Sequence, residues 1–489
     1  LPSRHQSMRL FGLGSKLLLV DEVHAHDTYV NELLKKLLTF HAYIGGSAIL
    51  LSATLPRKMR NELTRAYLRG CGKPAKLIEE TDAYPLATIV KNHQTQNIPV
   101  QASQRSIRRV PVELMHEEDA AINELKVKLS KSQCACWIRN TVWDAIQAYR
   151  LLLKDKAVDP SKIMLFHARF ILGDRLRIEN KVIKAFGKKS TAKDRDGRIL
   201  ISSQVIENSL DLCLDGMVSD LAPIDAIIQR AGRLHRHRRD ARGNPLVESD
   251  AVDQRPSPKL YILSPDMVEP PNAKWYSDFF PKAAFVYPHV GRLWLTARIL
   301  MEKKEINMPF HLRELIEGVY AEAFEKIPEN LIEASKEAEA DAMGMASLGK
   351  YNGLEFGRGY DFRSGEWSEE INVPTRLGEE TNTVYLARLE NDRLVPLKEG
   401  SFPWDLSSLR LSKRKLEKIS PKTEEKYHDH LEELIESEKR LTNNDLIIPV
   451  KEIGDRKCTS EGINGKGDVV DIIYDENLGM MVGDEIRGG

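Results

Sequence analysis

The sequence has few cysteines, no long apolar run and no excess of either charge. Five cysteines in 489 residues are too few for a disulfide framework, which favours a reducing compartment and predicts a cytoplasmic protein. No run reaches the roughly 18 apolar residues of a membrane span, and the first residues lack the regions of a signal peptide. With 72 basic and 72 acidic residues, any nucleic-acid surface must come from local clustering, as in the six arginines from Arg230 to Arg242.

The remaining pattern is that of a soluble α/β protein. Short apolar stretches at 17–20 and 48–51 predict two strands, and between them lies an amphipathic helix with Asp27 as its N-cap. This strand, helix, strand order implies a parallel sheet with a right-handed crossover. Residues 83–111 read as a connection, after which strands and helices alternate again from 134 to 228. We expect two α/β lobes.

Polar residues follow both strands of the first lobe. Asp21 and Glu22 end the first strand, and Ser52 and Thr54 end the second. Paired carboxylates at this edge suit the hydrolysis of a magnesium-bound nucleotide, one holding the Mg²⁺ shell and the other accepting a proton from water. The alternative is that solvated acids simply end a strand and that the hydroxyls cap the following turn.

A second set of residues lies in the other lobe, in the string QRAGRLHRH. Arg233 and Arg236 are three residues apart and share a helical face, from which two guanidiniums can meet phosphate oxygens. The alternative is a basic surface that binds phosphates without chemistry.

Two further strand ends carry polar residues suited to a nucleic-acid backbone. The loop 203–211 offers Ser203 and Gln204 as strand contacts and Asp211 for a ribose hydroxyl. His167 and Arg169 occupy a similar position after the strand at 163–166. Each segment alone also fits an ordinary turn.

These strings together resemble a known family. DEVH, SAT, SQVIENSLD and QRAGRLHR resemble motifs two, three, five and six of superfamily 2 helicases. The longer strings DEVHAHDTY, GGSAILLSATLP, LFHARF, GDRLRIENKVI and QRAGRLHRH are similar to the helicase part of the type I CRISPR-associated helicase-nuclease, most of all to its type I-E members.

The resemblance implies two RecA-like lobes, a mostly helical linker and a small C-terminal domain. We expect the C-terminal part of the first lobe at 1–85, the second lobe at 86–255, the linker at 256–400 and the small domain at 401–489. The implied cofactors are ATP and Mg²⁺, with Asp21 holding the metal through water. The resemblance implies that the nucleotide contacts and arginine fingers are Asp21, Glu22, Asp211, Gln229, Arg233 and Arg236. It implies motor coupling by Ser52 and Thr54, and DNA contacts by His167, Arg169, Ser203 and Gln204.

The family also carries, ahead of these motifs, an HD nuclease domain and a Walker A loop that grips phosphates. The string G-x-x-x-x-G-K-[ST] is absent here, so the first lobe is expected to be incomplete and the chain alone to hydrolyse ATP poorly. The resemblance implies a 3′ to 5′ single-stranded DNA translocase, with the displaced target strand, an RNA-guided surveillance complex and the missing N-terminal half as partners. Two alternatives stay open, a fragment that binds DNA or a partner passively and an RNA helicase of the DEAD or DEAH kind.

Overall fold

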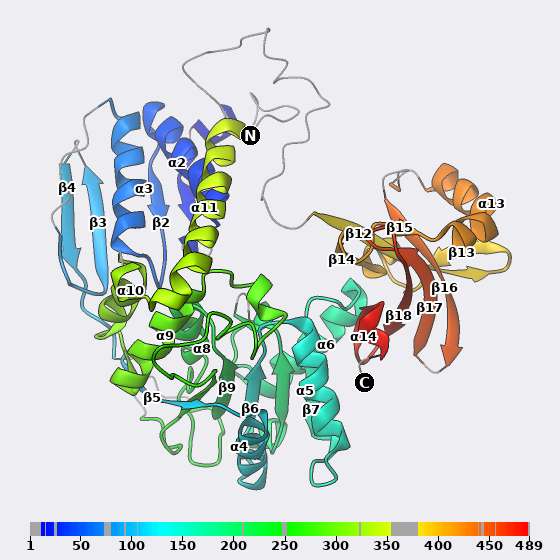
Figure 1. Ribbon diagram of the computed structural model, residues 1–489, viewed down its shortest axis with the longest axis horizontal. Coiled ribbons are helices and arrows are strands. Elements are labelled where there is room, and N and C mark those ends of the chain that lie inside the picture. Colours follow the sequence, from blue (N-terminus) through cyan, green and yellow to red (C-terminus); the bar gives the residue numbers. More distant parts are fainter. Residues whose placement is uncertain are drawn as a thin grey trace. The chain divides into compact units, whose positions relative to one another are not determined.

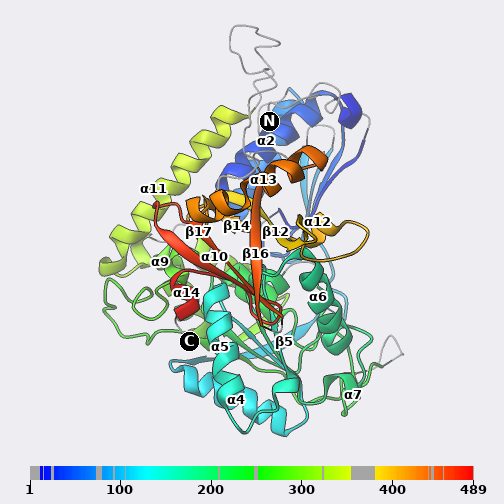
Figure 2. The same cartoon turned by 90° about the vertical axis from the view of Figure 1, so that its right-hand side faces the viewer.

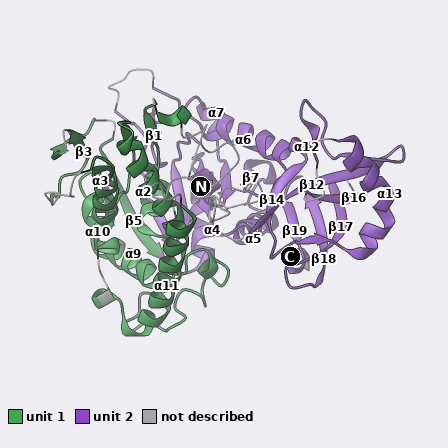
Figure 3. Cartoon of the chain, turned by 90° about the horizontal axis from the view of Figure 1, so that it is seen from above, with its two compact units in different colours: residues 1–114, 221–231, 264–377 green, residues 115–220, 232–263, 378–489 purple. Residues whose placement is uncertain are grey.

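The computed structural model describes most of the chain between residues 11 and 487 (Figure 1). The segments it does not describe within that span are 15, 24–26, 73–79, 92–93, 105, 208–209, 247–251, 322–323, 354–379, 439, 442–444 and 455. The chain divides into two compact units (Figure 3). Unit 1 contains residues 1–114, 221–231 and 264–377, and unit 2 contains 115–220, 232–263 and 378–489.

Unit 1 contains the two predicted strands of the first lobe. β1 (Leu18–Val20) and β2 (Ala48–Leu50) pair in parallel, and α2 (Thr28–Tyr43) forms the crossover between them. Asp27 caps α2 as predicted, since its carboxylate accepts a hydrogen bond from the Val30 amide at 2.8 Å. α3 (Arg57–Gly70) follows β2 and packs against α2 (Figure 1).

The rest of unit 1 is helical with short strand pairs. The helices are α8 (Ile224–Ala231), α9 (Val290–Lys303), α10 (Leu312–Tyr320) and α11 (Glu329–Asn352). The antiparallel pairs are β3 (Leu86–Lys91) with β4 (Gln94–Pro99), and β5 (Arg108–Met115) with β11 (Glu305–Met308). Residues 86–99 form a hairpin within 83–111, the segment that was expected to connect the two lobes. Its polar Gln and Asn side chains hid the alternation that a solvated hairpin shows.

Unit 2 contains a parallel sheet in the order β10-β9-β6-β8-β7, as predicted for the second lobe. Its strands are β6 (Ala135–Ile138), β7 (Ile163–Phe166), β8 (Ile199–Ser202), β9 (Gly216–Asp220) and β10 (Leu260–Leu263). All residues of β6, β8 and β9 are buried, which explains their unbroken apolar runs. The associated helices are α4 (Glu118–Ser130), α5 (Val142–Lys154), α6 (Leu172–Phe186) and α7 (Ala192–Arg195).

The C-terminal part of unit 2 is a sheet in the order β13-β12-β16-β17-β18-β19, with β14 on β12 and β15 on β17. The strands are β12 (Thr381–Glu390), β13 (Arg393–Pro396), β14 (Ser408–Ser412), β15 (Lys418–Ile419), β16 (Leu446–Gly454), β17 (Lys457–Ile463), β18 (Val469–Asp475) and β19 (Gly479–Val482). Its helices are α12 (Pro403–Leu406), α13 (Pro421–Ser437) and α14 (Asp484–Arg487); Figure 2 shows α13 beside the sheet. β18 and β19 form a hairpin within this sheet, whose first two strands precede residue 401, the expected start of the small C-terminal domain.

Each face of this sheet contributes to an apolar core. One core is formed around Trp404, with side chains from α13 packed against it. The other contains Ile171, which directly precedes α6, together with residues of β12, β16 and β18. The C-terminal sheet is thus packed onto the end of β7 and the start of α6. Among the described residues, no helix is long and apolar enough to cross a membrane.

Candidate functional site

The carboxyl ends of β1 and β2 bring together the predicted residues of the first lobe. Val20 pairs with Leu50, and the Leu51 amide donates to the Val20 carbonyl at 2.9 Å, so both strands end at one edge. Asp21 and Glu22 are exposed there. Glu22 has φ of 52°, a backbone region that non-glycine residues rarely adopt and that recurs at functional sites.

The SAT segment lies at the same edge and contains a buried hydroxyl without a described partner. The Ser52 hydroxyl accepts a hydrogen bond from the Thr54 amide at 3.3 Å. Thr54 is 1% exposed, and its Oγ1 has no hydrogen-bond partner among the described residues. An orphaned buried hydroxyl and two exposed carboxylates at a strand edge fit the oxygen-rich surroundings of a magnesium-bound nucleotide.

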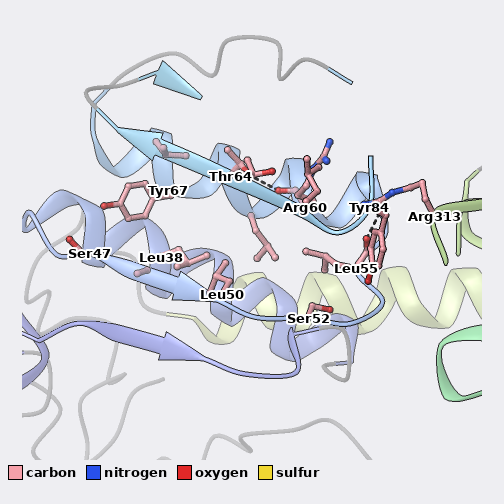
Figure 4. A pocket seen from close by; sticks show the side chains of 15 residues that line it. Leu38, Ser47, Leu50, Ser52, Leu55, Arg60, Thr64, Tyr67, Tyr84 and Arg313 are labelled. Atoms are coloured by element: carbon pink, nitrogen blue, oxygen red, sulfur yellow. Dashed lines mark hydrogen bonds between the residues drawn. The ribbon is translucent and has the colours of Figure 1, made fainter. Parts of the chain in front are cut away.

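A cavity of 290 Å³ lies beside this segment, between β2, α3 and β3 (Figure 4). Ser52, Arg60, Tyr84 and Arg313 are among the residues that line it. The Tyr84 hydroxyl donates to the carbonyl of Ala53, and the Arg313 guanidinium lies 5.2 Å from the centre of the Tyr84 ring. The backbone of the SAT segment is therefore held by side chains that lie far from it in sequence.

One face of the β1–β2 pair is apolar and open among the described residues. Leu18 and Leu50 point to the other face and pack with α2 and α3. The residues that alternate with them are 45–60% exposed: Leu17, Leu19, Ile49 and Leu51. Contiguous exposed apolar side chains on a parallel sheet are unusual, because such sheets are normally covered on both faces.

Unit 2 also gathers predicted residues at one sheet edge. Ile138 of β6 pairs with Ser202 of β8, and Phe166 of β7 pairs with Ser202 on the other side. Ser203 is buried directly after β8, and the Gln204 side-chain amide donates to the Asn140 carbonyl at 2.7 Å. The two predicted strand contacts therefore lie at the carboxyl edge of the central strands, where open α/β sheets bind ligands.

The same edge contains an ion pair that the sequence reasoning missed. Arg139 and Asp220 are both buried, with Nε 2.9 Å from Oδ2, and the Trp137 indole donates to the other oxygen of Asp220 at 3.2 Å. Burial alone would lower the pKa of Arg139, but the carboxylates of Asp220 and Glu118 hold it above its ordinary value. Asp220 is the last residue of β9 and Asp21 directly follows β1, so strand-end position was the available signal.

The arginine motif packs against the loop that follows β8. Arg233 is buried, and its guanidinium donates to the carbonyls of Leu210 and Glu207. Arg236 is about 40% exposed, and its Nε lies 2.8 Å from Oδ1 of Asp211, which is also 2.8 Å from Nε2 of His237. The structure thus brings the predicted Asp211 and Arg236 together, whereas Gln229 lies near the end of α8 in unit 1.

A buried network of charged side chains contacts the backbone of this motif. Asp215 contacts Arg195 and Arg255, each at 2.8 Å, and Arg255 also donates to the His237 carbonyl at 2.8 Å. Burial would raise the pKa of Asp215, yet the two guanidiniums hold it well below its ordinary value. Burial, followed by the charge of Arg255, lowers the pKa of His235 to about 4, so this histidine is neutral near neutral pH.

The predicted contacts His167 and Arg169 are engaged by the C-terminal domain. His167 has no exposed surface, its Nε2 lies 3.0 Å from the Leu478 carbonyl, and its Nδ1 accepts from the Arg169 amide at 3.2 Å. Arg169 pairs with Glu485 at 2.6 Å. Burial, followed by the charge of Arg169, lowers the pKa of His167 to about 3. In this arrangement His167 offers no surface to DNA, and the role predicted for both residues stays a prediction.

Comparisons with known proteins agree with this arrangement of the motif residues. Residues 131–239 match the family described as CRISPR-associated nuclease/helicase Cas3, C-terminal. The CRISPR-associated endonuclease/helicase Cas3 of Escherichia coli is 34% identical over 339 residues, which cover 67% of this chain. The chain is a relative of Cas3. It spans about a third of the length of that curated relative, of which the match covers 35%.

Solved structures extend the likeness of this Cas3 relative to the whole fold. The crystal structure of T. fusca Cas3-ATP matches 98% of the chain and 55% of its own chain, with a TM-score of 0.78 and 24% identity. A chain in the structure described as "CRISPR RNA-guided surveillance complex, pre-nicking" matches with a TM-score of 0.71 and 23% identity, covering 98% of this chain and 58% of that one. The predicted α/β fold with RecA-like lobes is thereby confirmed.

Proposed function

We propose that this Cas3 relative is the motor part of a CRISPR helicase-nuclease, an ATP-driven 3′ to 5′ translocase on single-stranded DNA. The observation that carries the proposal is the shared edge of β1 and β2, where Asp21 and Glu22 meet the SAT segment in the register of a parallel sheet. Kinship to Cas3 supports the helicase activity, since the E. coli relative is described as an endonuclease/helicase.

In this proposal the residues of the two strand edges have defined chemical roles. Magnesium-bound ATP supplies the phosphoryl group whose hydrolysis releases energy. Asp21 would hold the metal through water, and Glu22 would orient the attacking water and accept its proton. Arg236 is exposed enough to exchange its ion pair with Asp211 for one with a phosphate. Arg233 would have to give up its hydrogen bonds to two backbone carbonyls in order to bind a phosphate. Ser203 and Gln204 would contact the DNA backbone.

We further propose that additional polypeptide covers the open face of the β1–β2 pair. Four leucine and isoleucine side chains on that face are 45–60% exposed, and a solvated parallel pair of this kind is costly. The occupant we propose is the half of the protein that carries the phosphate-gripping loop and the nuclease. Recruitment to an RNA-guided surveillance complex is proposed from kinship, since a matching chain is part of such a complex.

The test is DNA-stimulated ATP hydrolysis. Three proteins are compared: this chain, the chain extended upstream by its natural coding sequence, and the extended form carrying Asp21→Ala. We expect stimulation by single-stranded DNA only in the extended wild type, because the chain lacks the Walker A string. Robust turnover by the chain alone, or normal turnover by the Asp21→Ala form, contradicts the proposal.

The same assay separates the two alternatives. Stronger stimulation by RNA than by DNA would favour an RNA helicase of the DEAD or DEAH kind. Silence of the extended protein with retained binding to DNA would favour a passive binding module.

A further inference from the structure

The turn that follows the SAT segment is held by helix α10, which lies more than 250 residues further along the chain. The Arg313 guanidinium donates to the Leu55 carbonyl at 3.2 Å, and the carboxylate of Glu317 accepts from the Arg57 amide at 2.9 Å. Arg313 and Glu317 also pair with each other at 3.0 Å, one helical turn apart. Two side chains of one helix therefore fix the turn between Leu55 and Arg57.

Glu317 does the work of a cap for helix α3. The residue at the N-cap position of α3 is Pro56, whose side chain makes no capping hydrogen bond. The first amides of a helix need acceptors, and a carboxylate at that end is further favoured by the helix dipole. Glu317 supplies both the acceptor and the charge, so the start of α3 depends on α10.

Glu317 is also the best-buried carboxylate paired with the guanidiniums around this turn. Arg57, Arg60 and Arg313 lie close together, and burial, followed by the charges of Arg313 and Arg57, lowers the pKa of Arg60. Glu317 is 16% exposed, whereas two other carboxylates of the described residues that pair with Arg57, those of Glu80 and Asp82, are at least 70% exposed. Loss of the Glu317 charge therefore weakens the whole turn.

The other end of α10 holds a second helix. The hydroxyl of Tyr320, the last residue of α10, donates to the carboxylate of Asp225 in the first turn of α8. The Arg292 guanidinium lies 5.4 Å from the centre of the Tyr320 ring and fixes its orientation. α8 ends at Ala231, two residues before Arg233. Helix α10 thus contacts both the SAT turn and the helix that leads into the arginine motif.

We propose that α10 is a positioning helix that couples the SAT turn to α8, with Arg313, Glu317 and Tyr320 as its contact residues. In this proposal these residues act through the protein segments that they hold. The inference rests on the proposed motor function. It states that α10 transmits a conformational change at the Ser52–Arg57 turn to the arginine motif. A nine-residue helix about 14 Å long is stiff enough for this task.

The first experiment is hydrogen exchange on the full chain. We expect Glu317→Ala to speed exchange at the start of α3 by about 10- to 100-fold, the range for a lost charge-assisted hydrogen bond. We also expect a measurable rise in α8, at the far end of α10. Tyr320→Phe should act in the reverse direction, raising exchange in α8 and, more weakly, at 53–57. The matched control is Glu314→Ala, which removes an exposed carboxylate from the same helix.

The proposal is overturned if each variant changes the hydrogen-exchange rate only in the segment next to the substituted residue, with no change at the other end of α10. Glu317→Gln, which keeps an acceptor oxygen, guards against unfolding: it should restore most of the protection at α3. If Glu317→Ala unfolds the whole unit, the Tyr320→Phe variant decides by the same criterion.

The second experiment uses the protein extended by its upstream coding sequence. We expect Tyr320→Phe and Glu317→Ala to raise the number of ATP molecules hydrolysed per nucleotide translocated by about fivefold or more, the lower end of typical coupling factors. KM for ATP should stay unchanged, which separates coupling from nucleotide binding. Equal losses of hydrolysis and translocation would overturn the inference. An extended wild-type protein without DNA-stimulated hydrolysis would instead refute the motor function, while the exchange data would still judge α10.

Discussion

The docking of the C-terminal domain onto the second lobe should weaken as the pH falls, because it buries a neutral histidine. His167 is fully buried with its Nε2 against the Leu478 carbonyl, so Nε2 carries the proton and Nδ1 accepts from the backbone. A second proton on Nδ1 would face the Arg169 amide and the Arg169 charge. Burial, followed by the charge of Arg169, lowers the pKa of His167 to about 3.

The magnitude follows from proton linkage. With a folded pKa of about 3 against an ordinary 6.5, the unfolded state binds more protons between these values, so stability falls as the pH falls. Between about pH 7 and about pH 5, His167 alone should remove roughly 2 kcal/mol, or about 30-fold in the opening equilibrium. Glu485 does not contribute in this window. Burial would raise its pKa, but Arg169 and Lys415 lower it to about 2.

The Met480 amide reports this docking directly, since it donates to the Arg169 carbonyl at 2.9 Å. Its hydrogen-exchange protection factor is measured at both pH values in the wild type and in His167→Gln, whose amide can still donate to Leu478. The wild type should lose about 30-fold in protection and the variant much less. His235 is present in both proteins, so its titration cancels. An equal loss in the two proteins would refute the assignment of the pH dependence to His167.

Three further outcomes are expected. Gly479 has φ of +75°, and a Cβ there would lie 2.7 Å from the His167 ring, so Gly479→Ala should cost about 1–3 kcal/mol in urea unfolding. Arg139→Met leaves Asp220 buried without its cation and should cost about 3–5 kcal/mol, while adding Asp220→Asn should recover part of that loss. Leu19→Lys places a charge on the open face and should lower the binding of an apolar dye by the chain while leaving its unfolding midpoint nearly unchanged.

Local patterns predicted the elements whose signals are local. The cap at Asp27 and the apolar runs at 17–20 and 48–51 are each read from a few neighbouring residues, and the structure confirms all three. The shared edge of Asp21 and Ser52 followed from the parallel crossover rule. The C-terminal sheet was harder because β12 pairs in parallel with β16, some 60 residues away, and no local signal records such pairing.

The candidate site shows the same division. Residue types and strand ends pointed to Asp211 and Arg236, which lie together as an ion pair. The Arg139–Asp220 ion pair was not predicted, because no periodic pattern in the sequence indicates which charged residues form a buried pair. His167 was expected at a DNA surface, yet its surroundings come from residues 478–485, more than 300 positions away. Strand-end position identifies a polar residue worth attention but not the segment that covers it.

Groups far away in the sequence therefore set the geometry of several motif residues. The turn after the SAT segment is fixed by Arg313 and Glu317, the strand end at His167 by the Leu478 carbonyl just before β19, and the His237 carbonyl by Arg255. In each case a polar group of the motif is satisfied by a partner outside it, so the motif string alone leaves that group unpaired. If the proposed motor function and the proposed role of α10 hold, two chains with identical motif strings differ in motor behaviour when α10 or the segment around β19 differs, because these elements contact the backbone at the motifs.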